Sequence, residues 1–300
     1  MLNWSLIFAL GMAWGSSFYF NAVLLRELGP LTVALGRVGV GALVCWLWLI
    51  ATRKPWRVAP AMVAPLALFG LVQYALPLAV YPFVQQYITS AAAGIVNAMT
   101  PIMVVIVSQV WPGGERATWI KSIGVALGFA GIVVLVSPAF AGQGTSNPWA
   151  LLATMAAPLC YGIALNLMRH FDRMDRTVLT AWSLMLGTAI LVPVALGREG
   201  MPVITLAQTW VALAILGGVL TAGAFILLFW LIPRVGGTTA STITLIAPIS
   251  AVLLGAWLLG EVVTAPQLIG MAIILLGLLF VDGRLMAWLR PGRRAAPADP

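Results

Sequence analysis

Polar and aromatic side chains recur at regular spacing inside otherwise apolar stretches of this chain. Tyr74, Pro77, Tyr81 and Gln85 follow one another at intervals of three and four residues, so they share one face of a helix. Arg37 is the one charged residue well inside such a stretch. Phenol, amide and guanidinium groups in apolar surroundings suit the recognition of a small amphipathic solute, because polar groups within a membrane usually face a cavity or another helix.

Three further polar faces have the same helical spacing. They are formed by Trp14 and Ser17, by Ser90, Asn97, Pro101 and Ser108, and by Ser241, Thr244 and Pro248. Each proline should free a carbonyl one turn earlier, that of Asn97 for Pro101 and that of Thr244 for Pro248. Two interpretations remain open for these groups. They line a wet cavity, or they hydrogen-bond a neighbouring helix, a contact that averages only about 0.6 kcal/mol.

The elements that carry these residues are expected to be membrane helices. Of the 300 residues, 62% are hydrophobic and 8% are charged, which leaves more apolar surface than a soluble domain could bury. A spanning helix needs about 20 mostly apolar residues, and such windows follow one another almost end to end. The sequence therefore predicts an all-α polytopic membrane protein with ten spans. Their approximate ranges are 3–24, 31–52, 62–85, 89–111, 119–137, 148–168, 178–197, 208–232, 238–259 and 266–285.

Basic residues predict the orientation of the chain. The loops after the even-numbered spans and the C-terminal tail hold Arg53, Lys54, Arg57, Arg116, Lys121, Arg169, Arg173, Arg176, Arg234, Arg284, Arg290, Arg293 and Arg294. The opposite side holds Arg26 and Arg198, each beside a glutamate. This bias places both termini in the cytoplasm, in a bacterial inner membrane. It also accounts for the net charge of +8 without a nucleic-acid partner.

The sequence contains a weak internal repeat. Pro101 and Pro248 lie 147 residues apart, and at the same distance Trp14 and Tyr19 match Tyr161 and Asn166. GERATWIKSIGVALGFAGIVVLV (114–136) also aligns with GEVVTAPQLIGMAIILLGLLFVD (260–282), with glycines at matching places. Chance similarity between apolar segments is the alternative interpretation.

Two halves of five spans each would enter the membrane in opposite directions, because five is odd. Inverted repeats of this kind are typical of secondary transporters. The predicted organisation is one repeat over residues 1–140, an inverted repeat over 148–285 around a central cavity, and a disordered cytoplasmic tail over 286–300.

Two motifs carry a resemblance to a known family. AWGSSFYF (13–20) lies in the first span, and a mid-helix proline followed by GE and spaced glycines occurs twice. The chain thus resembles the drug/metabolite transporter superfamily in its ten-span EamA-type form. It departs from the pattern at CYG (160–162), where Tyr161 replaces tryptophan. The resemblance implies two inverted halves around a cavity and the transport, mostly export, of amino acids, other small metabolites or organic cations.

The candidate substrate-binding residues follow from the polar faces and from the repeat. They are Trp14, Tyr19, Arg37, Tyr74, Tyr81, Gln85, Asn97, Tyr161, Asn166, Trp182 and Thr244, with Pro77, Pro101 and Pro248 as helix-kink or gating positions. For Arg37 two roles remain open: attracting a substrate carboxylate, or extending to the outer interface and capping carbonyls of another helix. The expected partners are a small molecule, such as an amino acid, and the lipid bilayer. The oligomeric state is open, with a monomer plausible.

The sequence gives little support for the coupling of transport to a proton gradient. Proton-driven carriers generally use an intramembrane Asp, Glu or His, whereas Glu115 and Glu261 lie at predicted span ends and His170 lies in a basic loop. A helix-end role is expected for the glutamates, in the first turn of the helix that follows each of them. A facilitator, or a carrier driven by the solute gradient and the membrane potential, is therefore expected, without a cofactor or metal.

Three other functions are alternatives for such a chain. A multidrug or organic-cation exporter and a lipid-carrier flippase are the transport alternatives. An intramembrane enzyme is the remote one, because catalysis would need a nucleophile, a base or metal ligands that these apolar spans lack.

Overall fold

The computed structural model describes residues 2–143 and 146–283. Over these ranges the chain folds into helices joined by short turns, with no strand. The prediction of an all-α polytopic membrane protein is confirmed. The predicted tail, 286–300, lies outside the described residues, as do the four arginines that follow Gly283.

Nine apolar helical stretches in the described part of the chain are long enough to cross a membrane, and a tenth is shorter. Several are assembled from consecutive pieces, where a π-helix, a turn or a 3-10 turn interrupts the α-helix. The stretches are α1 (Leu2–Leu24); α2 (Pro30–Ala51); η1 (Pro60–Met62) with α3 (Val63–Gly70), η2 (Leu71–Ala75) and α4 (Leu76–Val84); α5 (Ser90–Asn97) with α6 (Thr100–Val110); α7 (Trp119–Phe140); α8 (Pro148–Ala153) with α9 (Ala156–Leu167) and η3 (Met168–Phe171); α10 (Arg176–Glu199); α11 (Ala207–Leu213) with η4 (Ala214–Gly223) and α12 (Ala224–Val235); α13 (Gly237–Ala240) with α14 (Thr242–Leu259); and α15 (Ala265–Val281). The count of ten full-length spans is not confirmed, because α15 has only 17 residues.

Helix starts correct one expectation from the sequence. The glutamates of the two GE pairs were expected to serve the first turn of the helices that follow them. Instead, α7 is capped by Thr118, whose hydroxyl accepts from the Lys121 amide, and α15 is capped by a capping box between Thr264 and Gln267. A hydroxyl one residue before the helix already satisfies these amides, which leaves the carboxylate of Glu261 for another helix.

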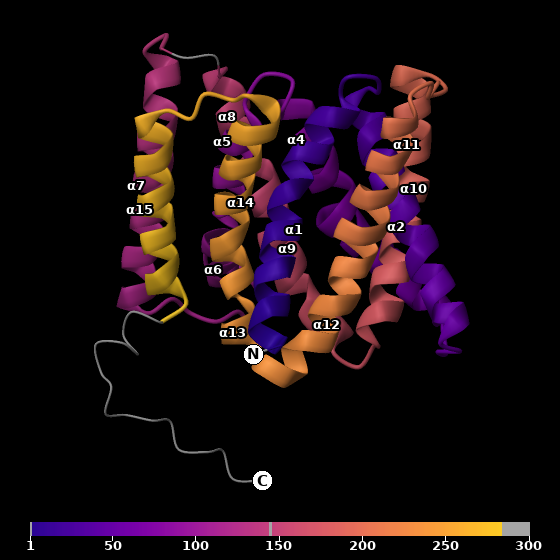
Figure 1. The fold of residues 1–300 in the computed structure, drawn as a ribbon. Helices are drawn as coiled ribbons and strands as arrows, with labels where there is room; N and C mark the ends of the chain where they lie inside the picture. The colour runs from indigo at the N-terminus through magenta and orange to yellow at the C-terminus, as the bar shows by residue number, and fades with distance from the viewer. Residues whose placement is uncertain (1, 144–145, 284–300) are drawn as a thin grey trace.

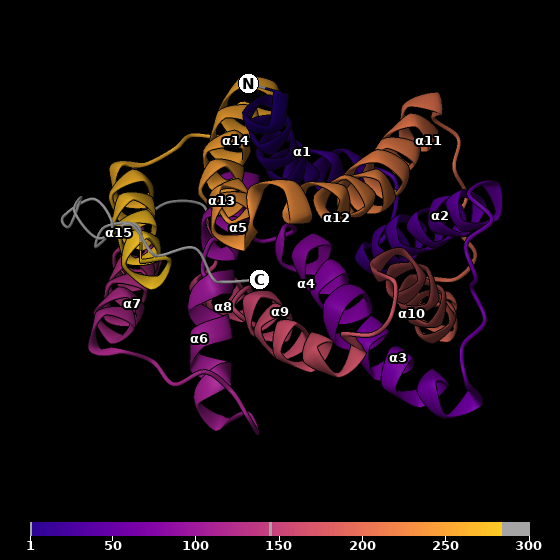
Figure 2. The same cartoon turned by 90° about the horizontal axis from the view of Figure 1, so that it is seen from below.

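Figure 1 shows the helices side by side with alternating direction, with the start of α1 and the end of α15 at its lower end. We call this end the lower face and the opposite end the upper face. Figure 2 shows α7 and α15 together at one edge, while α1, α14, α12, α4 and α9 surround the centre. The basic loops after α2, α6, η3 and α12 all lie on the lower face.

The contacts between helices form a paired pattern. The contact of α1 with α14 corresponds to that of α9 with α6, and the contact of α2 with η4 corresponds to that of α10 with α3. The contacts of α2 with α10 and of α7 with α15 join a helix to its own counterpart. A two-fold relation between residues 147 apart would produce this pattern.

Glycines give the same relation at atomic detail in the contact of α7 with α15. A Cβ built on Gly124 would lie 2.5 Å from the carbonyl oxygen of Gly277, and one built on Gly131 would lie 2.7 Å from that of Gly270. Gly124 aligns with Gly270 and Gly131 with Gly277, so each contact is the image of the other. Small residues allow such close approach of membrane helices.

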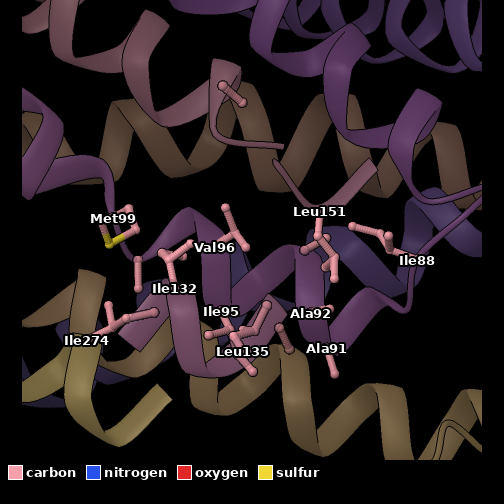
Figure 3. Packing of buried hydrophobic residues seen from close by; sticks show 14 of the residues in the cluster. Ile88, Ala91, Ala92, Ile95, Val96, Met99, Ile132, Leu135, Leu151 and Ile274 are labelled. Carbon is pink, nitrogen blue, oxygen red and sulfur yellow. The ribbon is translucent and has the colours of Figure 1, made fainter. Parts of the chain in front are cut away.

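The main apolar core lies between α5, α6, α7 and α15. Figure 3 shows Ile95, Val96 and Met99 facing Ile132 and Ile274, and all five side chains are buried. Because lipid is as apolar as these residues, their packing contributes through close contact rather than through transfer from water. This core holds α5 and α6 in place beside the centre of the molecule.

We predict that Gly131→Ala destabilises the protein by about 1–3 kcal/mol, because the new methyl group must push the backbone of α15 away. Gly197→Ala is the matched control, since a Cβ at Gly197 meets no atom within 4 Å. Thermal unfolding of the purified protein in detergent measures both. Equal melting temperatures for the two variants would contradict the close contact.

Candidate functional site

A cavity of about 350 Å³ lies at the centre of the helices. Most of its wall is apolar or aromatic, with a few polar groups, as in sites that bind small molecules. The wall residues used below are Trp14, Ser17, Phe18, Arg37, Gln73, Tyr74, Leu78, Tyr81, Asn97, Thr100, Tyr161, Met168, Thr221, Phe225, Ile232, Ser241 and Thr244.

The cavity extends to the lower face. Met168, Ile232 and Ser241 belong to its wall and lie at the lower ends of their spans. At the other end, the wall stops at Phe18 and Tyr81, whose rings meet edge to face with centroids 5.1 Å apart. The structure is therefore open below and closed above.

Arg37 is the only charged residue in the described wall of the cavity. Its side chain is 7% exposed, so it does not extend to the outer interface. Nε donates to Thr221 Oγ1 at 3.0 Å, and one terminal nitrogen donates to Ser17 Oγ at 3.2 Å. None of the ion pairs among the described residues includes Arg37. Burying an unpaired charge is costly, so the guanidinium is a candidate binding group for an anion.

Tyr81 and Asn97 form the second polar pair of the wall. The Tyr81 hydroxyl donates to Asn97 Oδ1 at 2.6 Å. The sequence predicts that Pro101 leaves the Asn97 carbonyl without a backbone partner. In the structure this carbonyl accepts a hydrogen bond from the Thr100 hydroxyl at 2.8 Å, so it is not left open to the cavity. A local hydroxyl thus repairs the break between α5 and α6, and the Asn97 side chain serves both the cavity wall and the contact between helices.

Aromatic rings make up the side of the wall near the lower half of the cavity. Phe225 lies between Trp14 and Tyr74, with ring centroids at 5.6 Å and 5.5 Å. Tyr161 and Thr244 complete the group of predicted residues that the structure brings to the cavity. Seven of the predicted residues therefore share one wall: Trp14, Arg37, Tyr74, Tyr81, Asn97, Tyr161 and Thr244.

The structure places four predicted residues elsewhere. Tyr19 packs against Phe20. Asn166 is buried between α9 and α6, where it accepts from Ser108 Oγ at 2.7 Å. Trp182 donates from Nε1 to the Trp56 carbonyl at 2.8 Å near the lower face. Gln85 belongs to the upper closure described next. The prolines Pro77, Pro101 and Pro248 lie beside wall residues rather than in the wall itself.

A hydrogen-bond network closes the cavity above Phe18 and Tyr81. Gln85 accepts from Asn21 Nδ2 at 2.9 Å and donates to the Phe18 carbonyl at 2.8 Å and to Ser90 Oγ at 2.9 Å. The network joins the upper ends of α1, α4 and α5. An amide is well suited to this place because it donates and accepts at once.

Three carboxylates bind helix N-termini of the other half of the chain, all on the upper face. Glu261 accepts from the Ser90 and Ala91 amides of α5 at 2.7 and 2.9 Å. Glu199 accepts from the amides of residues 31 and 32 in α2 at 2.9 and 2.8 Å. Glu27 accepts from the residues that lead into α11. Carboxylates are favourable at helix N-termini, where amides lack partners. We call these three contacts the upper latches.

Hydrogen bonds from Thr209 and Thr205 lower the pKa of Glu27 from its usual 4.5 to about 2. A carboxylate with a lowered pKa in the folded state contributes stability above its ordinary pKa and loses this contribution as the pH falls towards the lowered one. The Glu27 latch is therefore fully charged at neutral and mildly acidic pH.

Sequence reasoning missed several wall residues. The helical spacing places Ser17 on the same face of α1 as Trp14 but does not mark it as a binding residue, and it gives no signal for Gln73, Thr221 or Phe225. Gln73 and Thr221 lie in the π-helical segments η2 and η4, where an α-helical period no longer assigns the face. In the described residues no group of three or more His, Cys, Asp and Glu side chains could hold a metal ion.

Comparisons with known proteins agree with this architecture. A model of the EamA-like transporter family matches residues 3–137 and 148–281. An uncharacterized transporter of Archaeoglobus fulgidus is 25% identical over 94% of this chain and 99% of its own length. The uncharacterized transporter YoaV of Bacillus subtilis is 22% identical, over 91% and 94%. The uncharacterized inner membrane transporter YedA of Escherichia coli K12 is 24% identical, over 92% and 89%.

A solved crystal structure has the same fold. It aligns with a TM-score of 0.65 over 95% of this chain and 97% of that one, at 22% sequence identity.

We predict that Arg37→Met raises the free energy of unfolding by about 1 kcal/mol or more, because it removes a buried charge without a counter-ion and keeps an apolar side chain of similar length. Arg26→Met, in an exposed loop, should stay within about 0.5 kcal/mol of the parent protein. Thermal unfolding in detergent measures both variants. A lower melting temperature for Arg37→Met would mean that the guanidinium stabilises the fold.

Proposed function

The chain belongs to the EamA-like transporter family, and on that premise we propose that it carries small amphipathic solutes with a carboxylate, amino acids first among them, across a bacterial inner membrane. Its homologues are named as transporters, and one of them as an inner membrane transporter. The observation that carries the choice of solute is Arg37. A buried cation with two hydroxyl partners and no acidic partner among the described residues, in the wall of an apolar cavity, offers a carboxylate a charge-assisted hydrogen bond.

We propose that transport proceeds by alternating access between two related halves. The repeated glycine contacts of α7 with α15 and the paired helix contacts support two inverted units over residues 1–140 and 148–285. The cavity opens on the lower face, where the basic loops gather, and the positive-inside rule makes that face cytoplasmic. An opening on the cytoplasmic side, with the upper latches closed, is the state that an exporter loads.

The acidic wall residues that proton coupling would need are missing from the described wall of the cavity. We therefore keep the proposal of a facilitator, or of a carrier driven by the solute gradient and the membrane potential. An organic-cation exporter is the second candidate for the same fold, and Arg37 disfavours it because a cation would meet a like charge.

Transport by proteoliposomes tests the choice of solute. Counterflow of L-phenylalanine should fall about tenfold or more in Arg37→Gln, because a hydrogen bond to a charged group contributes about 1.5–3 kcal/mol. Arg37→Lys, which keeps the charge, should recover part of the rate. Dissipating a pH gradient at clamped voltage should leave the rate unchanged.

Tetraphenylphosphonium is the opposing probe in the same vesicles. Faster counterflow of this cation than of L-phenylalanine in the parent protein, rising further in Arg37→Gln, would replace the proposal with the organic-cation exporter.

The upper latches predict the behaviour of a gate. Glu261→Gln replaces one acceptor oxygen by an NH₂ group that faces a backbone amide. We expect this change to destabilise the closed upper side by about 1 kcal/mol. The population that is open on the upper, outward side should then rise roughly fivefold. The variant Leu78→Cys, in a protein whose Cys45 and Cys160 are replaced by alanine, measures how accessible the cavity is from outside. Labelling by an impermeant maleimide added outside whole cells should rise about fivefold.

Glu115→Gln is the matched control for this gate, because Glu115 is exposed on the lower face and pairs with Lys121. Unchanged labelling in Glu261→Gln, or an equal rise in both variants, would remove the latch from the gating step.

A further inference from the structure

Gln73 is a cavity-wall residue with an unpartnered amide. Its side chain is 7% exposed, and its Oε1 is buried without a hydrogen-bond partner. The described residues contain other buried polar atoms of this kind, on Asn21, Trp46, Arg176 and Ser183. Of these residues, Gln73 alone belongs to the wall of the cavity.

An amide in this position is unfavourable for the empty protein. Buried polar groups are nearly always paired, and an unpaired one keeps its full desolvation cost. An apolar side chain of the same length would pack in the same place without that cost. The amide therefore suits a state in which a bound molecule supplies its partner.

The local backbone places Gln73 next to the aromatic part of the wall. Gln73 lies in the π-helical segment η2, one residue before Tyr74, whose ring contacts Phe225. The other long π-helical segment, η4, holds Thr221, which accepts from Arg37. π-helical turns are rare and frequently occur at functional sites. The two segments thus place Gln73 and the hydroxyl that anchors Arg37 in the wall of the same cavity.

Resting on the proposed carboxylate site at Arg37, we propose that Gln73 hydrogen-bonds the ammonium group of a zwitterionic solute. An ammonium group has only donors, which match the unpartnered Oε1 once the amide turns toward the solute. The aromatic rings of Tyr74 and Phe225 in the same wall favour a cation as well. Asn97 Oδ1, the other amide oxygen of the wall, already accepts from Tyr81. The solute class is therefore a molecule that carries both an amine and a carboxylate, such as an α-amino acid.

Three probes separate the two ends of the solute: L-phenylalanine, 3-phenylpropanoate without the amine, and phenethylamine without the carboxylate. Calorimetric titration of the purified full-length protein in detergent measures their binding. Gln73→Met should weaken L-phenylalanine and phenethylamine about tenfold and leave 3-phenylpropanoate within about twofold, because only the first two donate to the amide. Gln86→Met, at an exposed glutamine outside the cavity, is the matched control.

A second variant keeps the proposal open to refutation if Gln73→Met folds poorly. Gln73→Glu adds a negative charge at the same place and should bind phenethylamine more tightly while weakening 3-phenylpropanoate. An equal loss for all three probes in Gln73→Met, or no loss for any, would overturn the role of Gln73. A parent protein that binds phenethylamine but neither acid would instead overturn the carboxylate site at Arg37. The role of Gln73 would then still be tested by comparing phenethylamine binding in the parent protein and in Gln73→Met.

Discussion

Polar groups in a membrane interior must find their partners within the protein, because lipid offers none. Two departures of this fold from straight helices follow from that constraint. The break before α6 is repaired by the Thr100 hydroxyl, which donates to the Asn97 carbonyl, and the Thr244 hydroxyl donates to the Ser241 carbonyl at 2.6 Å. Buried side-chain atoms without a partner also occur outside the cavity, as on Ser183, but Gln73 and the uncompensated charge of Arg37 lie in its wall.

The paired contacts of the two halves explain how a single cavity can be formed between them. Gly131 and Gly270 bring α7 and α15 into backbone contact at the edge of the molecule, while α1 with α14 and α9 with α6 surround the centre. The edge contact joins each half to its counterpart through small residues that allow little rearrangement. The central contacts are closed above by the Gln85 network and open below, so the two ends of the cavity differ although the helices around it make paired contacts.

The sequence allowed a good prediction of the scaffold and a partial one of the site. Apolar length and charge bias are summed over many residues, so the membrane class and the helical spans could be predicted, apart from the short α15. The helical period also found Tyr74, Tyr81 and Asn97. It found Tyr74 inside the π-helical segment η2 but missed the adjacent Gln73, and Thr221 in η4, because a π-helical turn changes which residues share one face. Asn166 and Gln85 have the same side-chain chemistry as wall residues, and only their neighbours in space decide that they hold helices together.

The upper latches have a consequence for how the sequence of this protein can vary. Glu261 and Glu199 bind main-chain N–H groups, which every residue type except proline supplies. The contact therefore does not restrict the residue type at the donating positions, such as Leu31 and Ala91, apart from excluding proline. It does require a carboxylate at the accepting positions. An alignment would reveal only one partner of each contact, and covariation between the two would be absent although they touch.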